Sequence, residues 1–135
     1  QIYLITTVTC QRCPVFTDLW AGRIVVNELR RLKDEGDADT LAWVLMPDHL
    51  HWLLALGNGR SLSRVIGQTK RYSAQQMNRA RGTKGQPVWQ DGFHDHALRQ
   101  EEDLKEIARY LIANPVRAGL VSRPADYPLW DACWL

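Results

Sequence analysis

The sequence predicts an α+β protein in which an antiparallel sheet carries helices on one face, the split β-α-β arrangement. The chain of 135 residues has the length of a single domain, 1–135, and 45% of its residues are apolar, which is enough for a core. Strand-like segments alternate with segments of helical periodicity, in the order strand, helix, strand, strand, helix, strand. An extra C-terminal helix follows the last strand.

The first half of the chain predicts a strand, a helix and a hairpin. The first strand is rich in β-branched residues and is broken by Pro14, and Asp18 is a suitable N-cap for the helix that follows. Pro47-Asp48 is a tight connection between two apolar strands. The expected ranges are 2–9, 41–46 and 49–56 for the strands and 19–33 for the helix.

The second half predicts two helices around one extended segment that breaks near Gly92. Ser61 is a suitable N-cap for the first of these helices, and Pro115 stops the second. The acidic first turn of the last helix, residues 101–103, suits the positive end of the helix dipole. The expected ranges are 62–78 and 101–114 for the helices, 88–98 for the extended segment, and 123–135 for a coil tail that packs back on the domain.

Composition argues against several classes of protein. No apolar run approaches the roughly 20 residues of a membrane span and no secretory signal pattern is present, so we expect a cytoplasmic protein. Because the chain begins at Gln1 inside a strand-like run, we expect a short leader to be missing. No phosphate-binding loop is present, so no nucleotide cofactor is expected. Cys10 and Cys13 have the spacing of a redox motif, and two reduced thiols are the alternative.

One segment concentrates the positive charge of a chain whose formal net charge is only +2. Residues 60–90 contain seven Lys or Arg and no Asp or Glu. Such a basic face favours nucleic-acid binding, because each phosphate that the protein neutralises releases counterions. A solvated helix face is the alternative, although such faces usually mix both signs of charge. The candidate DNA-binding residues are Arg64, Lys70, Arg71, Arg79, Arg81 and Lys84.

Two histidines flank one apolar residue in the strand over 49–56. Side chains alternate across a strand, so His49 and His51 point to one face and Leu50 points to the other. Two imidazoles side by side on a rigid strand form half of a divalent-metal site. A pair of core histidines with satisfied hydrogen bonds has the same spacing, and the pattern alone does not separate the two.

A second pair of polar residues lies in the last helix. Tyr110 and Asn114 are four residues apart, hence on one face if the helix persists to Pro115. A tyrosine phenolate is a competent nucleophile towards phosphorus, and an Asn amide oxygen is a hard ligand suited to Mg²⁺ or Mn²⁺. An ordinary tyrosine at the rim of the core is the alternative for Tyr110.

Four motifs follow one another along the chain. They are Met46-Pro47-Asp48-His49-Leu50-His51, Lys70-Arg71-Tyr72, Val88-Trp89-Gln90 and the run YLIANPVRAGLV over 110–121. This pattern resembles the single-tyrosine HUH transposases, and most of all the REP-associated tyrosine transposases. The first and last motifs are specific in combination, and the likeness covers nearly the whole chain. The cysteine pair and the Trp-rich tail are not part of the pattern.

The resemblance implies a ferredoxin-like fold, a Mg²⁺ or Mn²⁺ ion, and cleavage and joining of single-stranded DNA next to hairpins through a 5′-phosphotyrosine. It implies that His49 and His51 are paired metal ligands, that Asn114 is the third ligand, and that Tyr110, on the extra C-terminal helix, is the catalytic nucleophile. Insertion-sequence transposases of the same superfamily carry Gln at the comparable position, so Asn114 favours the REP-associated branch. Single-stranded or hairpin DNA is the expected partner of a bacterial protein that is a monomer or homodimer.

Other functions fit the same residues. One is a non-catalytic module that holds hairpin nucleic acid, and another is a metal-dependent nuclease or replication initiator built on the histidine pair. Tyr72, beside the basic residues, competes with Tyr110 for the role of nucleophile. Because tyrosine loses its proton only near pH of about 10, a base must assist it, and His94 and His96 are candidates.

Overall fold

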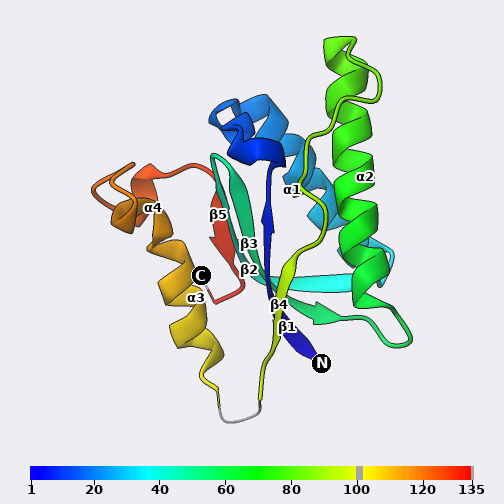
Figure 1. The fold of residues 1–135 in the computed structure, drawn as a ribbon. Helices are drawn as coiled ribbons and strands as arrows, with labels where there is room; N and C mark the ends of the chain where they lie inside the picture. Colours follow the sequence, from blue (N-terminus) through cyan, green and yellow to red (C-terminus); the bar gives the residue numbers. More distant parts are fainter. Residues whose placement is uncertain (100–101, 135) are drawn as a thin grey trace.

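The computed structural model describes residues 1–99 and 102–134 and has an α+β fold around one antiparallel sheet (Figure 1). Within the described residues the sheet has five strands, in the order β4-β1-β3-β2-β5. The strands are β1 (Ile2–Val8), β2 (Ala38–Met46), β3 (His49–Leu56), β4 (His94–Ala97) and β5 (Trp130–Ala132). The helices are α1 (Leu19–Asp34), α2 (Leu62–Arg81), α3 (Leu104–Ile112) and α4 (Asn114–Arg117). The predicted fold class is confirmed.

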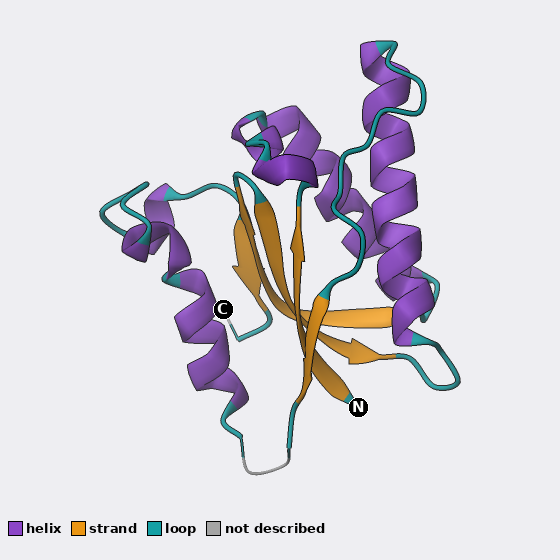
Figure 2. Ribbon diagram, in the orientation of Figure 1, coloured by secondary structure: helices purple, strands orange, loops and turns teal. Residues whose placement is uncertain are grey.

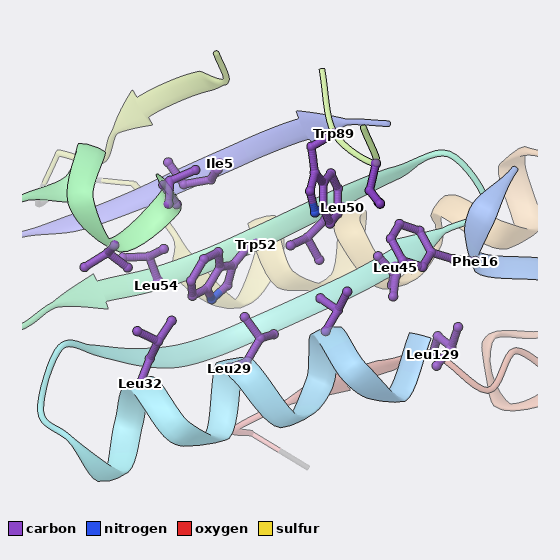
Figure 3. Packing of buried hydrophobic residues seen from close by; sticks show 14 of the residues in the cluster. Ile5, Phe16, Leu29, Leu32, Leu45, Leu50, Trp52, Leu54, Trp89 and Leu129 are labelled. Carbon is purple, nitrogen blue, oxygen red and sulfur yellow. The ribbon is translucent and has the colours of Figure 1, made fainter. Parts of the chain in front are cut away.

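Helices cover both faces of the sheet, with α1 and α2 on one face and α3 on the other (Figure 2). The two-residue period of β3 explains why one strand can serve two cores. Leu50, Trp52 and Leu54 pack in the larger core beneath α1 and α2 (Figure 3), where fully burying one such leucine contributes about 1.5–3 kcal/mol. Leu53 packs in the smaller core beneath α3. The histidines of β3 share the face of Leu53, so the sheet presents them towards α3.

The β2–β3 hairpin is held at its tip by the segment that follows β1. The backbone N–H of Thr9 donates to the Asp48 carbonyl over 2.9 Å, and the N–H of Phe16 donates to the Pro47 carbonyl over 3.0 Å. In the sheet, Met46 lies opposite His49, which leaves Pro47-Asp48 as the two-residue turn. Both sides of β3 are paired, with β1 and with β2, so its histidines stand on a backbone that is hydrogen-bonded along both edges.

The last helix begins later and ends earlier than predicted. It starts at Leu104 because the Asp103 carboxylate accepts hydrogen bonds from the backbone N–H groups of Lys105 (3.0 Å) and Glu106 (3.3 Å) and so caps it. Glu101, the predicted start, lies outside the described residues. The helix ends at Ile112 rather than at Pro115, which is buried in the first turn of α4, where its missing N–H costs nothing.

Two further boundaries differ from the prediction for identifiable reasons. The α2 helix continues to Arg81 because Gly82, at φ +67°, supplies the left-handed cap. The extended segment over 88–98 forms a regular strand only in β4, because Gly92 takes φ +79° and turns the chain. Before that turn, Trp89 makes only an isolated bridge to Thr9.

The tail was predicted as coil, and this prediction is wrong for residues 130–132, which form β5 at the edge of the sheet against β2. A three-residue strand is too short to show a two-residue period in the sequence. The tail packs back as expected: the Tyr127 hydroxyl donates to the Leu45 carbonyl over 2.5 Å, and Leu129 fills the space over Gly22. Every helix among the described residues is too short or too polar to traverse a lipid bilayer.

Candidate active site

The two histidines of β3 face each other on the α3 side of the sheet. Their Nε2 atoms are 3.1 Å apart, and their rings meet edge to face with centroids 4.7 Å apart. At this distance one Nε2 must donate a proton and the other must accept it. The pair is therefore positioned so that two nitrogen lone pairs can converge on a single ion that replaces the shared proton.

The outer nitrogens of the pair are each fixed by a polar neighbour. His49 Nδ1 lies 2.7 Å from a carboxylate oxygen of Asp48, and His51 Nδ1 lies 3.0 Å from the hydroxyl of Thr6 on β1. A carboxylate only accepts, so His49 carries its proton on Nδ1 and turns a bare Nε2 towards His51. A carboxylate behind a histidine in this way orients metal-ligating imidazoles and raises their basicity.

Asp48 is itself held by Arg12, whose Nε donates to its second oxygen over 3.1 Å. Burial favours the protonated carboxyl, but the hydrogen bonds from His49 and Arg12 outweigh it and leave the pKa of Asp48 below its ordinary value. The carboxylate is thus charged at neutral pH. Arg12 reaches it from a turn in which Gln11 (φ 54°) and Arg12 (φ 51°) are both left-handed, a costly conformation for residues other than glycine.

His51 is neutral at physiological pH. Burial lowers its pKa first, and the electrostatic effects of the neighbouring His49 and Arg117 lower it further, to about 4. Only the neutral imidazole can ligate a metal, so this residue needs no net loss of a proton near pH 7. The proton that its Nε2 shares with His49 has only to move to Nδ1, where the Thr6 hydroxyl can accept it.

Tyr110 and Asn114 meet His51 in one pocket. The cavity, of about 260 Å³, is lined by Leu4, Thr6, His51, Ile107, Tyr110, Leu111, Asn114 and Arg117. The predicted continuous helix ends at Ile112, but Ala113 keeps near-helical angles (φ −76°, ψ −5°) and α4 starts at Asn114, so the i, i+4 relation survives the break. Tyr110 is 68% exposed, which leaves its hydroxyl open to a macromolecule.

The donor set offers two imidazole nitrogens and one amide oxygen to a divalent ion. Among the described residues no three His, Cys, Asp or Glu side chains form a metal-binding group, so a third protein ligand would have to be of another type, such as Asn114. The two imidazoles and the amide oxygen of Asn114 leave further positions open, as Mg²⁺ and Mn²⁺ sites do when substrate oxygens complete the shell. The described cysteines, Cys10, Cys13 and Cys133, are free thiols.

The predicted DNA-binding residues lie on α2 and the loop after it, across the sheet from Tyr110. Arg64, Arg71, Arg79, Arg81 and Lys84 are exposed. Two residues of the set make polar contacts within the protein: Arg81 pairs with Asp18 at 3.5 Å, and the Lys70 ammonium donates to the carbonyls of Gln90 (2.8 Å) and Gly92. Burial lowers the pKa of Lys70. Lys70 therefore fixes the 90–92 loop, and of the six it is the least available to DNA.

The competing residues are placed differently. Tyr72 lies on α2, half-buried between the guanidinium groups of Arg31 (4.7 Å) and Arg71 (5.4 Å), and so is separated from the histidine pair by the sheet. His94 on β4 and His51 on β3 both lie opposite Thr6 in the sheet, so they share a face. His96 is engaged with Glu102 at 3.0 Å.

Sequence reasoning missed Thr6, Asp48 and Arg12. Asp48 directly precedes His49 in the hairpin turn, which is a signal that could have been used. Thr6 and Arg12 had no such signal, because their roles depend on the register of β1 against β3 and on the path of the chain after β1.

Residues 1–114 match the sequence model of a family described as "Transposase IS200 like". The REP-associated tyrosine transposase of Escherichia coli K12 is 32% identical over 100 residues, which are 73% of this chain and 56% of that protein. A putative REP-associated tyrosine transposase of Haemophilus influenzae is 28% identical over 99 residues, 67% of this chain and again 56% of the relative. The chain thus spans little more than half the length of these relatives.

Two solved structures share the fold. A REP-associated tyrosine transposase bound to a REP hairpin superposes with a TM-score of 0.74 at 24% identity, over 96% of this chain and 74% of that one. A putative transposase from Deinococcus radiodurans R1 gives a TM-score of 0.62 at 20% identity, over 84% of this chain and 89% of the other.

Proposed function

The chain belongs to the family of IS200-like transposases, and from that premise we propose that it cleaves and joins single-stranded DNA beside hairpins, with a divalent metal and a 5′-phosphotyrosine intermediate. One observation carries the proposal: an exposed tyrosine, an amide and one of two facing imidazoles line the same pocket. That set, with the second imidazole beside the first, supplies a nucleophile and three metal ligands. The hairpin is proposed from the solved relative that binds a REP hairpin.

His49, His51 and Asn114 would hold the metal, Mg²⁺ or Mn²⁺. When bound, it would supply positive charge to the oxygens of the scissile phosphate. Asp48 and Thr6 keep the two imidazoles oriented, so the rings need not turn for both Nε2 atoms to face one ion.

Tyr110 provides the covalent chemistry. Its oxygen attacks phosphorus, the bond to the 3′-oxygen breaks, and the DNA is left with a 3′-OH and a 5′-phosphate on tyrosine. The attacking hydroxyl releases its proton and the departing 3′-oxygen takes one up. Reversal by another 3′-OH joins strands without a nucleotide cofactor, because the phosphotyrosine keeps the energy of the broken bond. Of the two candidate bases, His94 shares the face of the site, whereas His96 is engaged with Glu102.

We expect a hairpin with a single-stranded flank to be cleaved and a fully paired duplex of the same sequence to be left intact. The nucleophile stands on a helix surface and needs a backbone that can bend into its pocket, which a single strand can do. Denaturing gels of end-labelled oligonucleotides with Mn²⁺ measure this. Equal cleavage of both substrates would contradict the proposed substrate class.

The exposed arginines of α2 are expected to bind DNA phosphates. Replacing Arg64, Arg71 and Arg79 with alanine should weaken binding to all hairpin sequences alike and reduce the slope of log K against log salt by about 0.7–0.9 for each phosphate that is no longer neutralised. Fluorescence anisotropy over a salt series measures the slope. The matched control is Arg81→Ala, since Arg81 already pairs with Asp18. An unchanged slope in the triple variant would place the DNA elsewhere.

Replacing Asp48 with asparagine should weaken Mn²⁺ binding by roughly 10- to 100-fold. The amide keeps the size of the side chain but can turn its NH₂ towards His49, which removes the acceptor that fixes the Nδ1 proton. Isothermal titration calorimetry compares the variant with wild type. Arg12→Gln should have a smaller effect because it loosens Asp48 without removing the carboxylate. Equal Mn²⁺ affinity in Asp48→Asn and wild type would show that the carboxylate does not support the site.

A further inference from the structure

Arg117 is a charged residue that lines the same pocket as His51, Tyr110 and Asn114. It stands about two helical turns beyond Tyr110, at the end of α4, and its guanidinium carbon lies 3.7 Å from the centroid of the Tyr110 ring. At that distance the planar cation is stacked on the face of the ring. One contact thereby joins the nucleophile of α3 to the end of α4.

Among the residues that the structure describes, no carboxylate neutralises the charge of Arg117. The neighbouring arginines of the same region are paired, Arg109 with Glu106 at 2.5 Å and Arg123 with Asp126 at 3.1 Å. Within the described ranges, no Asp or Glu lies within ion-pair distance of Arg117, and no acidic residue lines its pocket. Its charge also reaches His51, whose pKa it helps to lower. The pocket therefore has a net positive field before any metal enters it, which suits an anion.

We propose that Arg117 binds the scissile phosphate, its guanidinium taking the non-bridging oxygens of the phosphodiester that Tyr110 attacks; this inference rests on the function proposed above. A guanidinium is the side chain best suited to two oxygens of one phosphate, because its N–H donors form a rigid fork. Stacked on Tyr110, it is preplaced where charge develops as the phenol oxygen approaches phosphorus. Of the proposed metal ligands, His51 lies on the sheet side of this pocket and Asn114 on its α4 side, so the phosphate would be held from the sheet and from α4.

If Arg117 only stabilised the fold, its replacement would have a different effect. A cation in the last turn of a helix interacts favourably with its dipole, so Arg117 could simply stabilise α4 by about 0.3–1 kcal/mol. Loss of that interaction would lower the melting temperature and leave the salt dependence of DNA binding unchanged.

The test uses the chain with Tyr110→Phe, which keeps the ring beneath Arg117 and removes the hydroxyl. Binding is measured over a salt series for a hairpin with a single-stranded flank and for the same hairpin without it. Adding Arg117→Gln should reduce the slope of log K against log salt by about 0.7 for the flanked hairpin. The same slope for the bare hairpin should not change. Arg109→Gln is the matched control and should change neither slope, because Arg109 is exposed and paired with Glu106.

With Tyr110 restored, Arg117→Gln should lower the cleavage rate at saturating DNA by roughly 10²–10³-fold, and Arg117→Lys should recover part of it because it keeps the charge without the fork. An unchanged slope for the flanked hairpin, an unchanged saturating rate, or faster cleavage by Arg117→Gln would each overturn the proposal. The slopes are measured without cleavage, so they report on Arg117 even if Tyr110 proves not to be the nucleophile.

Discussion

Replacing both His49 and His51 with alanine is expected to abolish Mn²⁺ binding and, with it, cleavage of flanked hairpins. The two facing Nε2 atoms, 3.1 Å apart, are the proposed nitrogen ligands, and Asn114 alone would be a single weak ligand. Calorimetry should therefore show no heat above dilution. Cleavage assayed with Mn²⁺ should fall to background.

The control for this variant is His94→Ala, which removes an exposed histidine from the same face of the sheet and should leave Mn²⁺ affinity unchanged. Circular dichroism and a thermal melt show whether the double variant folds, since Thr6 and Asp48 both lose a partner. A folded double variant that binds Mn²⁺ as wild type does would place the metal elsewhere.

Replacing Tyr110 with phenylalanine is expected to eliminate cleavage, with a loss of about 10⁴-fold or more, as for the removal of other covalent nucleophiles. The variant loses one exposed hydroxyl and keeps the ring on which Arg117 stacks, so its unfolding free energy should change by less than about 0.5 kcal/mol. Hairpin binding should persist.

Tyr72→Phe is the matched control for that experiment. Tyr72 has the same chemistry but lies across the sheet, between Arg31 and Arg71, and its replacement should leave cleavage intact. If Tyr110→Phe retained cleavage and Tyr72→Phe lost it, Tyr72 and not Tyr110 would be the nucleophile.

Local periodicity was enough to predict the core of the site. A two-residue period places His49 and His51 on one face of any strand, and the structure shows them on one face. The i, i+4 spacing of Tyr110 and Asn114 survives although α3 ends between them, because Ala113 remains nearly helical. The paired strands and the two long helices were predictable for the same reason, since each is long enough to show its period.

Features that depend on distant parts of the chain were not predictable in this way. Thr6 joins the site only through the register of β1 against β3, and β5 is too short to carry a pattern. The basic segment over residues 60–90 was visible in the sequence as a run of like charge. The acid that pairs with Arg81, however, is Asp18 at the start of α1, which lies outside that segment. The run also gave no sign that α2 would cover the face opposite Tyr110.

The measurement that tests the central claim most directly is peptide mapping of the protein after reaction with a flanked hairpin whose cleaved end cannot be rejoined. The account predicts a DNA fragment linked through its 5′-phosphate to the peptide that contains Tyr110, formed only when Mg²⁺ or Mn²⁺ is present. Cleaved DNA with no protein attached, or an adduct on Tyr3, Tyr72 or Tyr127, would contradict it.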